Sequence, residues 1–130
     1  MNNHLEDIRN WRVLVVDDSV ELTEIVTHVL TSKGAQVIVA NTGKDAYNLL
    51  IDEQPTFILL DLTLPDTDGF ALLNTLRSQL QIACPVIAFT ARSHAEALDL
   101  TNQGFDAFVL KPFRMNTFVE RLSGILKQLE

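Results

Sequence analysis

Short runs of consecutive apolar residues recur along the chain, and each run is followed by polar residues. The runs cover residues 13–16, 37–40, 57–60, 85–89 and 107–110. An uninterrupted apolar run of this length is typical of a strand that is buried on both faces of a parallel sheet. The run at 57–60 consists of four consecutive apolar residues and leads directly into Asp61. It predicts a central strand.

Between these runs, apolar residues return at helical spacing. The pattern predicts helices over residues 19–33, 43–52, about 70–76, 94–103 and 115–129. The last helix has the clearest stripe, with Met115, Phe118, Leu122 and Ile125 on one side. Strand and helix thus alternate five times, which predicts an α/β fold with a parallel sheet and helices on both faces. Right-handed crossovers leave few topologies for such a chain.

Length and composition favour one folded domain. The chain has 130 residues, of which 47% are hydrophobic and 21% charged, enough for a sizeable core. Residues 1–11 are mostly polar, with Leu5, Ile8 and Trp11 as isolated apolar points. We predict a short N-terminal extension over residues 1–11 and one domain over residues 12–130.

Charge and hydropathy exclude several classes of protein. The net charge is −7 and the ten basic residues are scattered, which argues against direct binding of nucleic acid. No apolar run approaches the ~20 residues that span a bilayer, and the N-terminus lacks a secretory pattern. A cytoplasmic protein that does not contact a membrane is expected. The single cysteine, Cys84, lies beside an apolar run and is interpreted as a small core residue.

The candidate chemistry lies at the ends of the predicted strands. Asp17 and Asp18 follow the first strand, Asp61 ends the third, Thr90 follows the fourth, and Lys111 follows the fifth. The carboxyl ends of parallel strands share one edge of the sheet, where ligands bind in open α/β folds. The sequence therefore predicts three carboxylates, a hydroxyl and an ammonium in one crevice.

Three crowded carboxylates repel one another, and a divalent cation is the simplest remedy. Mg²⁺ prefers oxygen ligands and accepts one or two carboxylates while keeping waters. With the Lys111 ammonium, the cation balances the three negative charges and lets the site accept a phosphoryl group. Asp61 is the natural nucleophile, since a carboxylate can form an aspartyl phosphate.

Four segments resemble the receiver domain of two-component response regulators, the chemotaxis-regulator fold. They are VDDS at 16–19, LDLTLPDTDG at 60–69, FTA at 89–91 and GFDAFVLKPF at 104–113. All four occur in the right order and at strand ends, and the resemblance extends over about residues 12–129. It implies a doubly wound, flavodoxin-like three-layer sandwich with a five-stranded parallel sheet in the order 2-1-3-4-5.

The resemblance also implies a metal site and a phosphoacceptor. Asp61 looks like the phosphoacceptor, and Asp18 looks like a direct ligand of Mg²⁺ or Mn²⁺. Asp17 would act mainly through a bound water, and the backbone carbonyl of Thr63 would supply a further ligand. Such a domain is a phosphoacceptor and not a separate enzyme. It assists only its own phosphorylation and dephosphorylation.

A conformational switch and a set of partners follow from the same resemblance. Lys111 would hold a phosphoryl oxygen, Thr90 would be the switch hydroxyl, and Phe108 would turn inward when Thr90 moves. The Lys111–Pro112 peptide bond is expected to be cis. The implied partners are a sensor histidine kinase or phosphotransfer protein and an output protein or domain. The predicted helix 94–103 has no Lys or Arg for cross-subunit ion pairs, so a monomer or weak dimer is expected.

Each candidate residue also has a purely structural interpretation. Asp17 and Asp18 could cap the following helix, Thr90 could be a turn hydroxyl, Lys111 could be a solvated surface lysine, and Phe108 could serve core packing alone. The acidic segment 66–69 does not fit a calcium loop, because the first and last ligand positions hold apolar and hydroxyl residues. A surface turn with a helix cap is expected there.

Three other functions use similar residues. A receiver-like binding module would keep the fold without the switch, although the full set of polar residues argues against it. A metal-dependent phosphatase with an aspartyl intermediate usually has a second aspartate two residues after the nucleophile, where this chain has Thr63. A flavin mononucleotide carrier would need a phosphate-binding loop after the first strand, but Asp17 and Asp18 would repel a phosphate there.

Overall fold

The computed structural model of the chain describes residues 7–91, 96 and 99–129. The strands are β1 (Arg12–Val16), β2 (Gln36–Ala40), β3 (Phe57–Asp61), β4 (Val86–Thr90) and β5 (Ala107–Leu110). The helices are α1 (Val20–Ser32), α2 (Gly43–Asp52), α3 (Gly69–Ser78) and α5 (Met115–Gln128), and the 3₁₀ turns are η2 (Ile8–Asn10) and η3 (Leu100–Gln103). Of the helix predicted over 94–103, residues 94–95 and 97–98 lie outside the described residues, and the described end is the 3₁₀ turn η3.

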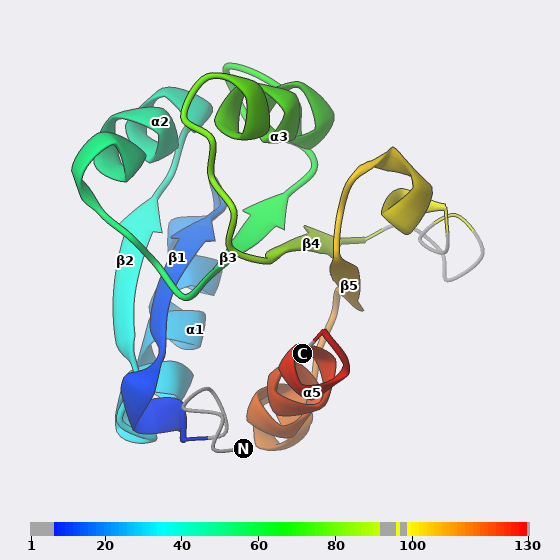
Figure 1. The fold of residues 1–130 in the computed structure, drawn as a ribbon. Helices are drawn as coiled ribbons and strands as arrows, with labels where there is room; N and C mark the ends of the chain where they lie inside the picture. The colour runs from blue at the N-terminus through cyan, green and yellow to red at the C-terminus, as the bar shows by residue number, and fades with distance from the viewer. Residues whose placement is uncertain (1–6, 92–95, 97–98, 130) are drawn as a thin grey trace.

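The five strands form one parallel sheet in the order β2-β1-β3-β4-β5, as Figure 1 shows. This order confirms the predicted doubly wound architecture. The central strand β3 pairs with β1 on one side and β4 on the other, and all five of its residues are buried. Its lack of a polar position before Asp61 is the consequence of being covered on both faces.

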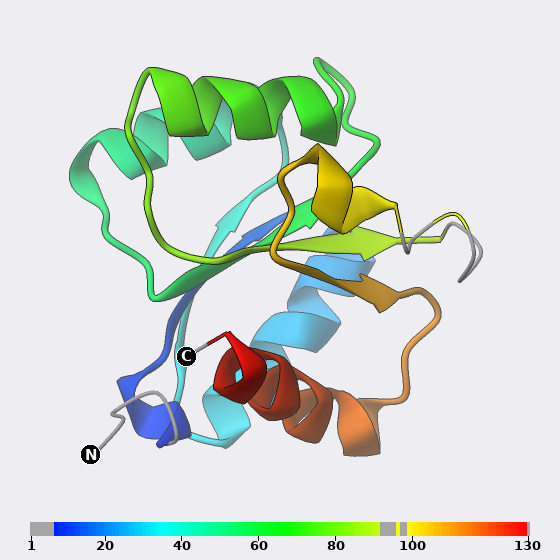
Figure 2. The ribbon, with the colours of Figure 1, turned by 45° about the vertical axis from the view of Figure 1, so that its right-hand side comes forward.

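Helices cover both faces of the sheet, with α2 and α3 on one side and α1 and α5 on the other (Figure 2). Successive side chains of a strand point to opposite faces, so β3 supplies both cores. Ile58 and Leu60 join the core under α2 and α3, whereas Phe57 and Leu59 join the core under α1 and α5. Within the residues described, no helix is both long enough and apolar enough to cross a membrane.

The segment before β1 reaches into the second of these cores. Trp11, the last residue of the predicted extension, is only 1% exposed. Its ring packs edge-on against Phe57 at 5.3 Å between ring centroids, and its carbonyl oxygen accepts the Gln36 N–H at 2.9 Å. Ile8 packs against the same core. The described end of the predicted extension is thus attached to the domain by a buried indole.

Helix starts close to the predicted site are capped by side chains. Ser19 is the N-cap of α1, and its Oγ accepts the Leu22 N–H at 3.2 Å. The interpretation of Asp17 or Asp18 as this cap is therefore wrong. Asp68 caps α3, with its Oδ1 accepting the Ala71 N–H at 2.7 Å, as the turn-and-cap interpretation of 66–69 predicted.

A partly buried network of polar contacts closes the opposite end of the molecule. The Arg77 guanidinium donates to the carbonyl oxygens of Ile82 and Cys84 and pairs with Asp106, which also accepts the Val86 N–H. These contacts join the end of α3 to the starts of β4 and β5. Cys84 is half-buried beside the α2–α3 core, and burial raises the pKa of its thiol to about 11. It is therefore a neutral packing residue at physiological pH.

Two glycines provide a test of how tightly the β3–α3 connection is packed. A Cβ at Gly69 would lie 2.8 Å from Leu62 Cα and 2.9 Å from the Asp61 carbonyl oxygen, both backbone atoms. We expect Gly69→Ala to lower the free energy of unfolding by about 1–3 kcal/mol, since this backbone cannot move aside without disturbing the sheet. The matched change Gly124→Ala in α5 meets nothing within 4 Å and should raise stability by about 0.5–1 kcal/mol. Urea unfolding measures both, and equal stability of the two variants would contradict this packing.

Candidate functional site

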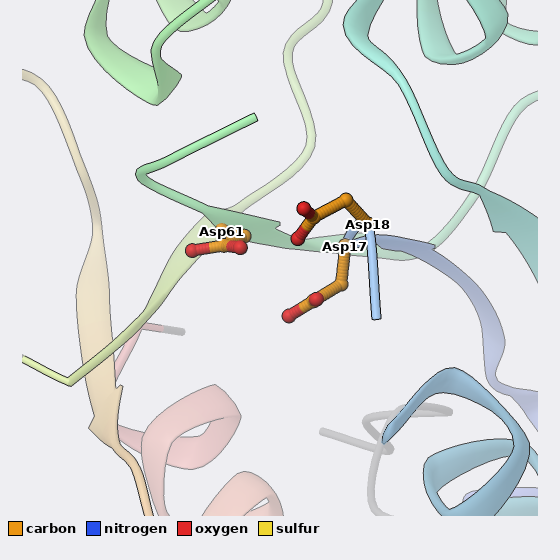
Figure 3. Close-up of side chains that lie close together, drawn as sticks. All are labelled: Asp17, Asp18 and Asp61. Atoms are coloured by element: carbon orange, nitrogen blue, oxygen red, sulfur yellow. The ribbon is translucent and has the colours of Figure 1, made fainter. Parts of the chain in front are cut away.

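The ends of β1 and β3 bring three carboxylates together. Asp17, Asp18 and Asp61 each offer an oxygen, and these oxygens lie within 4.8 Å of one another. Figure 3 shows the three side chains gathered between the ends of the two strands. Asp17 is 1% exposed and Asp61 is 8% exposed, whereas Asp18 is open to solvent. The predicted acidic cluster is therefore present, with one accessible and two buried members.

Asp17 is held by its surroundings on both carboxylate oxygens. Oδ2 accepts a hydrogen bond from Lys111 Nζ at 2.7 Å, and Oδ1 accepts the Ser19 N–H at 2.9 Å. The Asp17 carbonyl oxygen accepts from Asn41 Nδ2, and its N–H donates to Ala40. This buried charge is therefore paired and hydrogen-bonded, which is the condition under which burial of a carboxylate is tolerated.

Lys111 connects the fifth strand with the acidic cluster. Its ammonium lies 2.7 Å from Asp17 Oδ2 and 3.7 Å from Asp61 Oδ2, and the side chain is 22% exposed. The interpretation of Lys111 as a solvated surface lysine is therefore wrong. The Lys111–Pro112 peptide bond is cis, and the Lys111 N–H donates to the Thr90 carbonyl oxygen at 2.7 Å. The cation is thus shared between two buried acids.

The environment of Asp61 disfavours its charged form. Burial is the main cause that raises the pKa of Asp61, and the charges of Asp17 and Asp18 act in the same direction. The Thr63 N–H, which donates to Asp61 Oδ1 at 3.2 Å, and the Lys111 ammonium oppose this shift. Without a further cation, the carboxylate at the end of the central strand is thus electrostatically disfavoured.

The remaining predicted residues lie around this cluster. Thr90 is the buried last residue of β4 and pairs in register with Leu110 of β5. Phe108 is half-buried on β5 and packs against the α2–α3 core. Thr63 is exposed in the loop that follows Asp61, and its backbone pairs with Asp68 in an isolated antiparallel bridge.

One contributor to the site was missed by the sequence analysis. The Phe89 ring lies beneath the Lys111 ammonium, with the Nζ atom 5.0 Å from the ring centroid. A cation close to an aromatic face is stabilised by the ring quadrupole. Phe89 belongs to an apolar run that predicts a strand and to the FTA segment of the family resemblance, but neither separated this role from core packing.

The donor set fits a hard divalent cation. All three side chains of the cluster offer carboxylate oxygens, which Mg²⁺ and Mn²⁺ prefer over softer ligands. The backbone carbonyl of Thr63 belongs to the loop directly after Asp61 and is a further oxygen of the same kind. A cation here would offset the charge that raises the pKa of Asp61.

A family model described as the response regulator receiver domain matches residues 13–123. The chain belongs to this family. It is a CheY-like receiver domain of two-component signalling, and its acidic pocket is consistent with a magnesium-binding phosphorylation site.

Individual relatives agree with this assignment. The receiver domain is similar to the transcriptional regulatory protein KdpE of Mycobacterium tuberculosis, with 36% identity over 117 residues that cover 89% of this chain and 51% of that protein. It spans about half the length of the curated relatives it matches. Among solved structures, it is similar to the Francisella response regulator 1452 receiver domain, with a TM-score of 0.81, 30% identity, and coverage of 93% of this chain and 100% of that one. The chemotaxis response regulator CheY4 of Vibrio cholerae has the same TM-score at 26% identity, with coverage of 88% and 98%.

The raised pKa of Asp61 gives the receiver domain a defined pH dependence in metal-free buffer. The folded state holds the Asp61 proton more tightly than the unfolded state does, so stability falls as the pH rises from the unfolded value of about 3.9 through the folded pKa. Asp61→Asn removes this penalty. We expect the variant to be more stable than the natural chain at neutral pH and to lose that advantage as the pH approaches about 4.

Urea unfolding with a chelator present, repeated across this pH range, measures the difference. Asp52→Asn, at an exposed position on α2, controls for the loss of one negative charge. An Asp61→Asn variant that is less stable than the natural chain at neutral pH would contradict the electrostatic account of the cluster.

Proposed function

We propose that this receiver domain accepts a phosphoryl group on Asp61 in a reaction that depends on Mg²⁺ or Mn²⁺. The donor is the phosphohistidine of a sensor histidine kinase or phosphotransfer protein, or a small phosphodonor such as acetyl phosphate. The observation that carries the proposal is the shared Lys111 ammonium, 2.7 Å from Asp17 and 3.7 Å from Asp61, beside three mutually close carboxylates. Such an arrangement is electrostatically poised for an anion only when a cation completes it.

The chemical step uses the carboxylate of Asp61 as nucleophile. One of its oxygens forms a bond to phosphorus, and the bond from phosphorus to the donor breaks with its electron pair remaining on the leaving group. For a phosphohistidine, the leaving imidazole nitrogen takes up a proton from solvent. The Thr63 N–H on Asp61 Oδ1 fixes the orientation of the carboxylate. Lys111 then pairs with a phosphoryl oxygen, because its ammonium already lies beside Asp61 Oδ2.

The metal would be held by residues with different roles. Asp18 is exposed and would bind it directly. Both oxygens of Asp17 already accept hydrogen bonds, which supports an indirect contact through a water. Asp61 and the Thr63 carbonyl would complete the protein ligands. When bound, the metal offsets the charge of the phosphoryl oxygens.

Phosphorylation would be read out through the fourth and fifth strands. The Thr90 hydroxyl would turn toward the phosphoryl group, and Phe108 would move inward from its half-buried position. The two residues lie on adjacent, paired strands, which supports a coupled movement. The domain would act as a phosphoacceptor that assists its own turnover and not as a separate enzyme.

The partners are proposed from the class of the relatives. KdpE and GltR are named transcriptional regulatory proteins and are about twice as long as this chain. We therefore propose that the domain controls an output domain or protein, while the domain itself makes no contact with nucleic acid. A cytoplasmic location and a monomeric or weakly dimeric state remain predictions from the sequence.

Labelling of Asp61 tests the proposal directly. Incubation with acetyl phosphate and Mg²⁺ should add one phosphoryl group per chain, and Asp61→Asn should abolish the addition because no nucleophile remains. Intact-mass spectrometry measures both, and chelation of the metal should suppress labelling of the natural chain. Asp52→Asn serves as the matched acidic control and should label normally. Undiminished labelling of Asp61→Asn would show that Asp61 is not the phosphoacceptor.

The switch is tested at Thr90. Thr90→Ala should still accept one phosphoryl group, since it removes neither the nucleophile nor the metal ligands, but it should lose the reorganisation around Phe108. Backbone amide chemical shifts before and after phosphorylation report this movement. Thr90→Ser keeps the hydroxyl and should restore most of the change. Shift changes of equal size in the alanine variant and the natural chain would show that the hydroxyl is not the switch.

A further inference from the structure

The loop between β3 and α3 is fastened at its tip to another helix. The Asp66 carboxylate accepts two backbone hydrogen bonds from the start of α2, with Oδ1 bonded to the Gly43 N–H and Oδ2 to the Lys44 N–H, both at 2.9 Å. The first N–H groups of a helix have no partner within it and attract negative charge. These two hydrogen bonds hold the pKa of Asp66 below its usual value.

This contact adds to the cap that α2 already has. The α2 N-cap is Thr42, whose Oγ1 accepts the Asp45 N–H at 3.0 Å. Asp66 therefore satisfies the two preceding donors, from 22 and 23 residues further along the chain. A local cap needs no such distant partner, so the contact serves to join two elements.

The side chains of the loop tip lie close to the start of α2. A Cβ at Gly43 would lie 2.5 Å from Thr67 Cγ2 and 3.4 Å from Asp66 Oδ1. A side chain at Gly43 would therefore force the Thr67 side chain to move and would crowd the Asp66 carboxylate. Glycine at the first position of α2 and aspartate at the loop tip are complementary parts of one contact.

The other side of the same loop touches the phosphoacceptor. The Thr63 N–H donates to Asp61 Oδ1, and Thr63 pairs with Asp68 across the base of the loop. Inside this pair, the Leu64 N–H donates to the Thr67 carbonyl oxygen at 3.1 Å. The loop is thus a closed turn, and a displacement of its tip is transmitted to Thr63.

From these contacts we infer that Asp66 is a positioning residue for the metal and phosphoacceptor site. By fastening the turn to α2, it holds the Thr63 carbonyl and N–H beside Asp61. Asp66 does not bind the metal itself, because both of its oxygens are occupied by helix α2. This inference rests on the proposed function, since it concerns the same site.

Mg²⁺ demands closely defined ligand positions, so a turn that is free to move should bind it less well. Loss of a group that orients a metal ligand typically weakens metal binding by about 10–100-fold. We expect Asp66→Ala to raise the Mg²⁺ dissociation constant by about tenfold, at the lower end of this range because two buried leucines, Leu62 and Leu64, still anchor the turn. Asp66→Asn keeps one acceptor oxygen, so its Mg²⁺ dissociation constant should lie between those of the natural chain and of Asp66→Ala.

Two matched variants separate positioning from other effects. Thr42→Ala removes a cap from the same end of α2 without touching the turn, and so controls for a weakened helix. Asp45→Asn removes a negative charge from the exposed first turn of α2, and so controls for electrostatic attraction of the metal. Both should change the dissociation constant by less than about twofold. The effect of Asp66→Ala should persist in high salt, where an attraction between separated surface charges is screened.

The experiment is a calorimetric titration of each 130-residue chain with MgCl₂, at low and high salt, after circular dichroism has shown that each variant is folded. A selective loss of affinity in Asp66→Ala, with Asp66→Asn intermediate and both controls near the natural value, supports the inference. Unchanged affinity in the folded Asp66 variants, an equal loss in Thr42→Ala, or a loss that disappears in high salt would overturn it. If the natural chain itself bound no Mg²⁺, the proposed function would fail first, which is a distinct result.

Discussion

The crowding of Asp17, Asp18 and Asp61 is the interaction on which the rest of the site depends. Like charges this close repel one another, and two of the three are buried, so the fold bears an electrostatic cost at its functional edge. Lys111 offsets part of that cost from the end of β5, two strands away from β3, and the Phe89 ring beneath it supports the ammonium. The remaining imbalance favours the binding of a cation beside the three acids.

The architecture tolerates this cost because its stability comes from elsewhere. The sheet is covered by two apolar cores, and the central strand contributes to both. The carboxyl ends of β1, β3, β4 and β5 can therefore present polar groups at one edge without weakening either core. Functional sites commonly retain unfavourable interactions that the surrounding structure offsets. Gly69 packs closely against the end of β3, so the backbone beside the acids has little space in which to move.

The sequence predicted the elements well wherever the pattern was local. The limits of β3 and β5 follow from uninterrupted apolar runs, and the strand-end acids and lysine are the polar residues that come directly after such runs. Contacts between distant segments were not predictable. Trp11 stands in a polar segment, and its burial depends on Phe57 from the central strand. Ser19, not Asp18, caps α1. The sequence could not separate the two, because both residue types are suited to the N-cap position and tertiary contacts decide between them. The hold of Asp66 on α2 was hidden for the same reason.

The buried indole has a practical consequence for spectroscopy. Trp11 is the only tryptophan in the chain, and it precedes β1, whereas Asp17 follows that strand. Six steps of extended chain, through the five residues of β1, separate them by roughly 20 Å. The fluorescence of Trp11 should thus change when the native core is lost, and it should not change when a metal or phosphoryl group binds near Asp17. Unfolding of this domain can therefore be followed by tryptophan fluorescence, independently of chemistry at the acids, in the same sample.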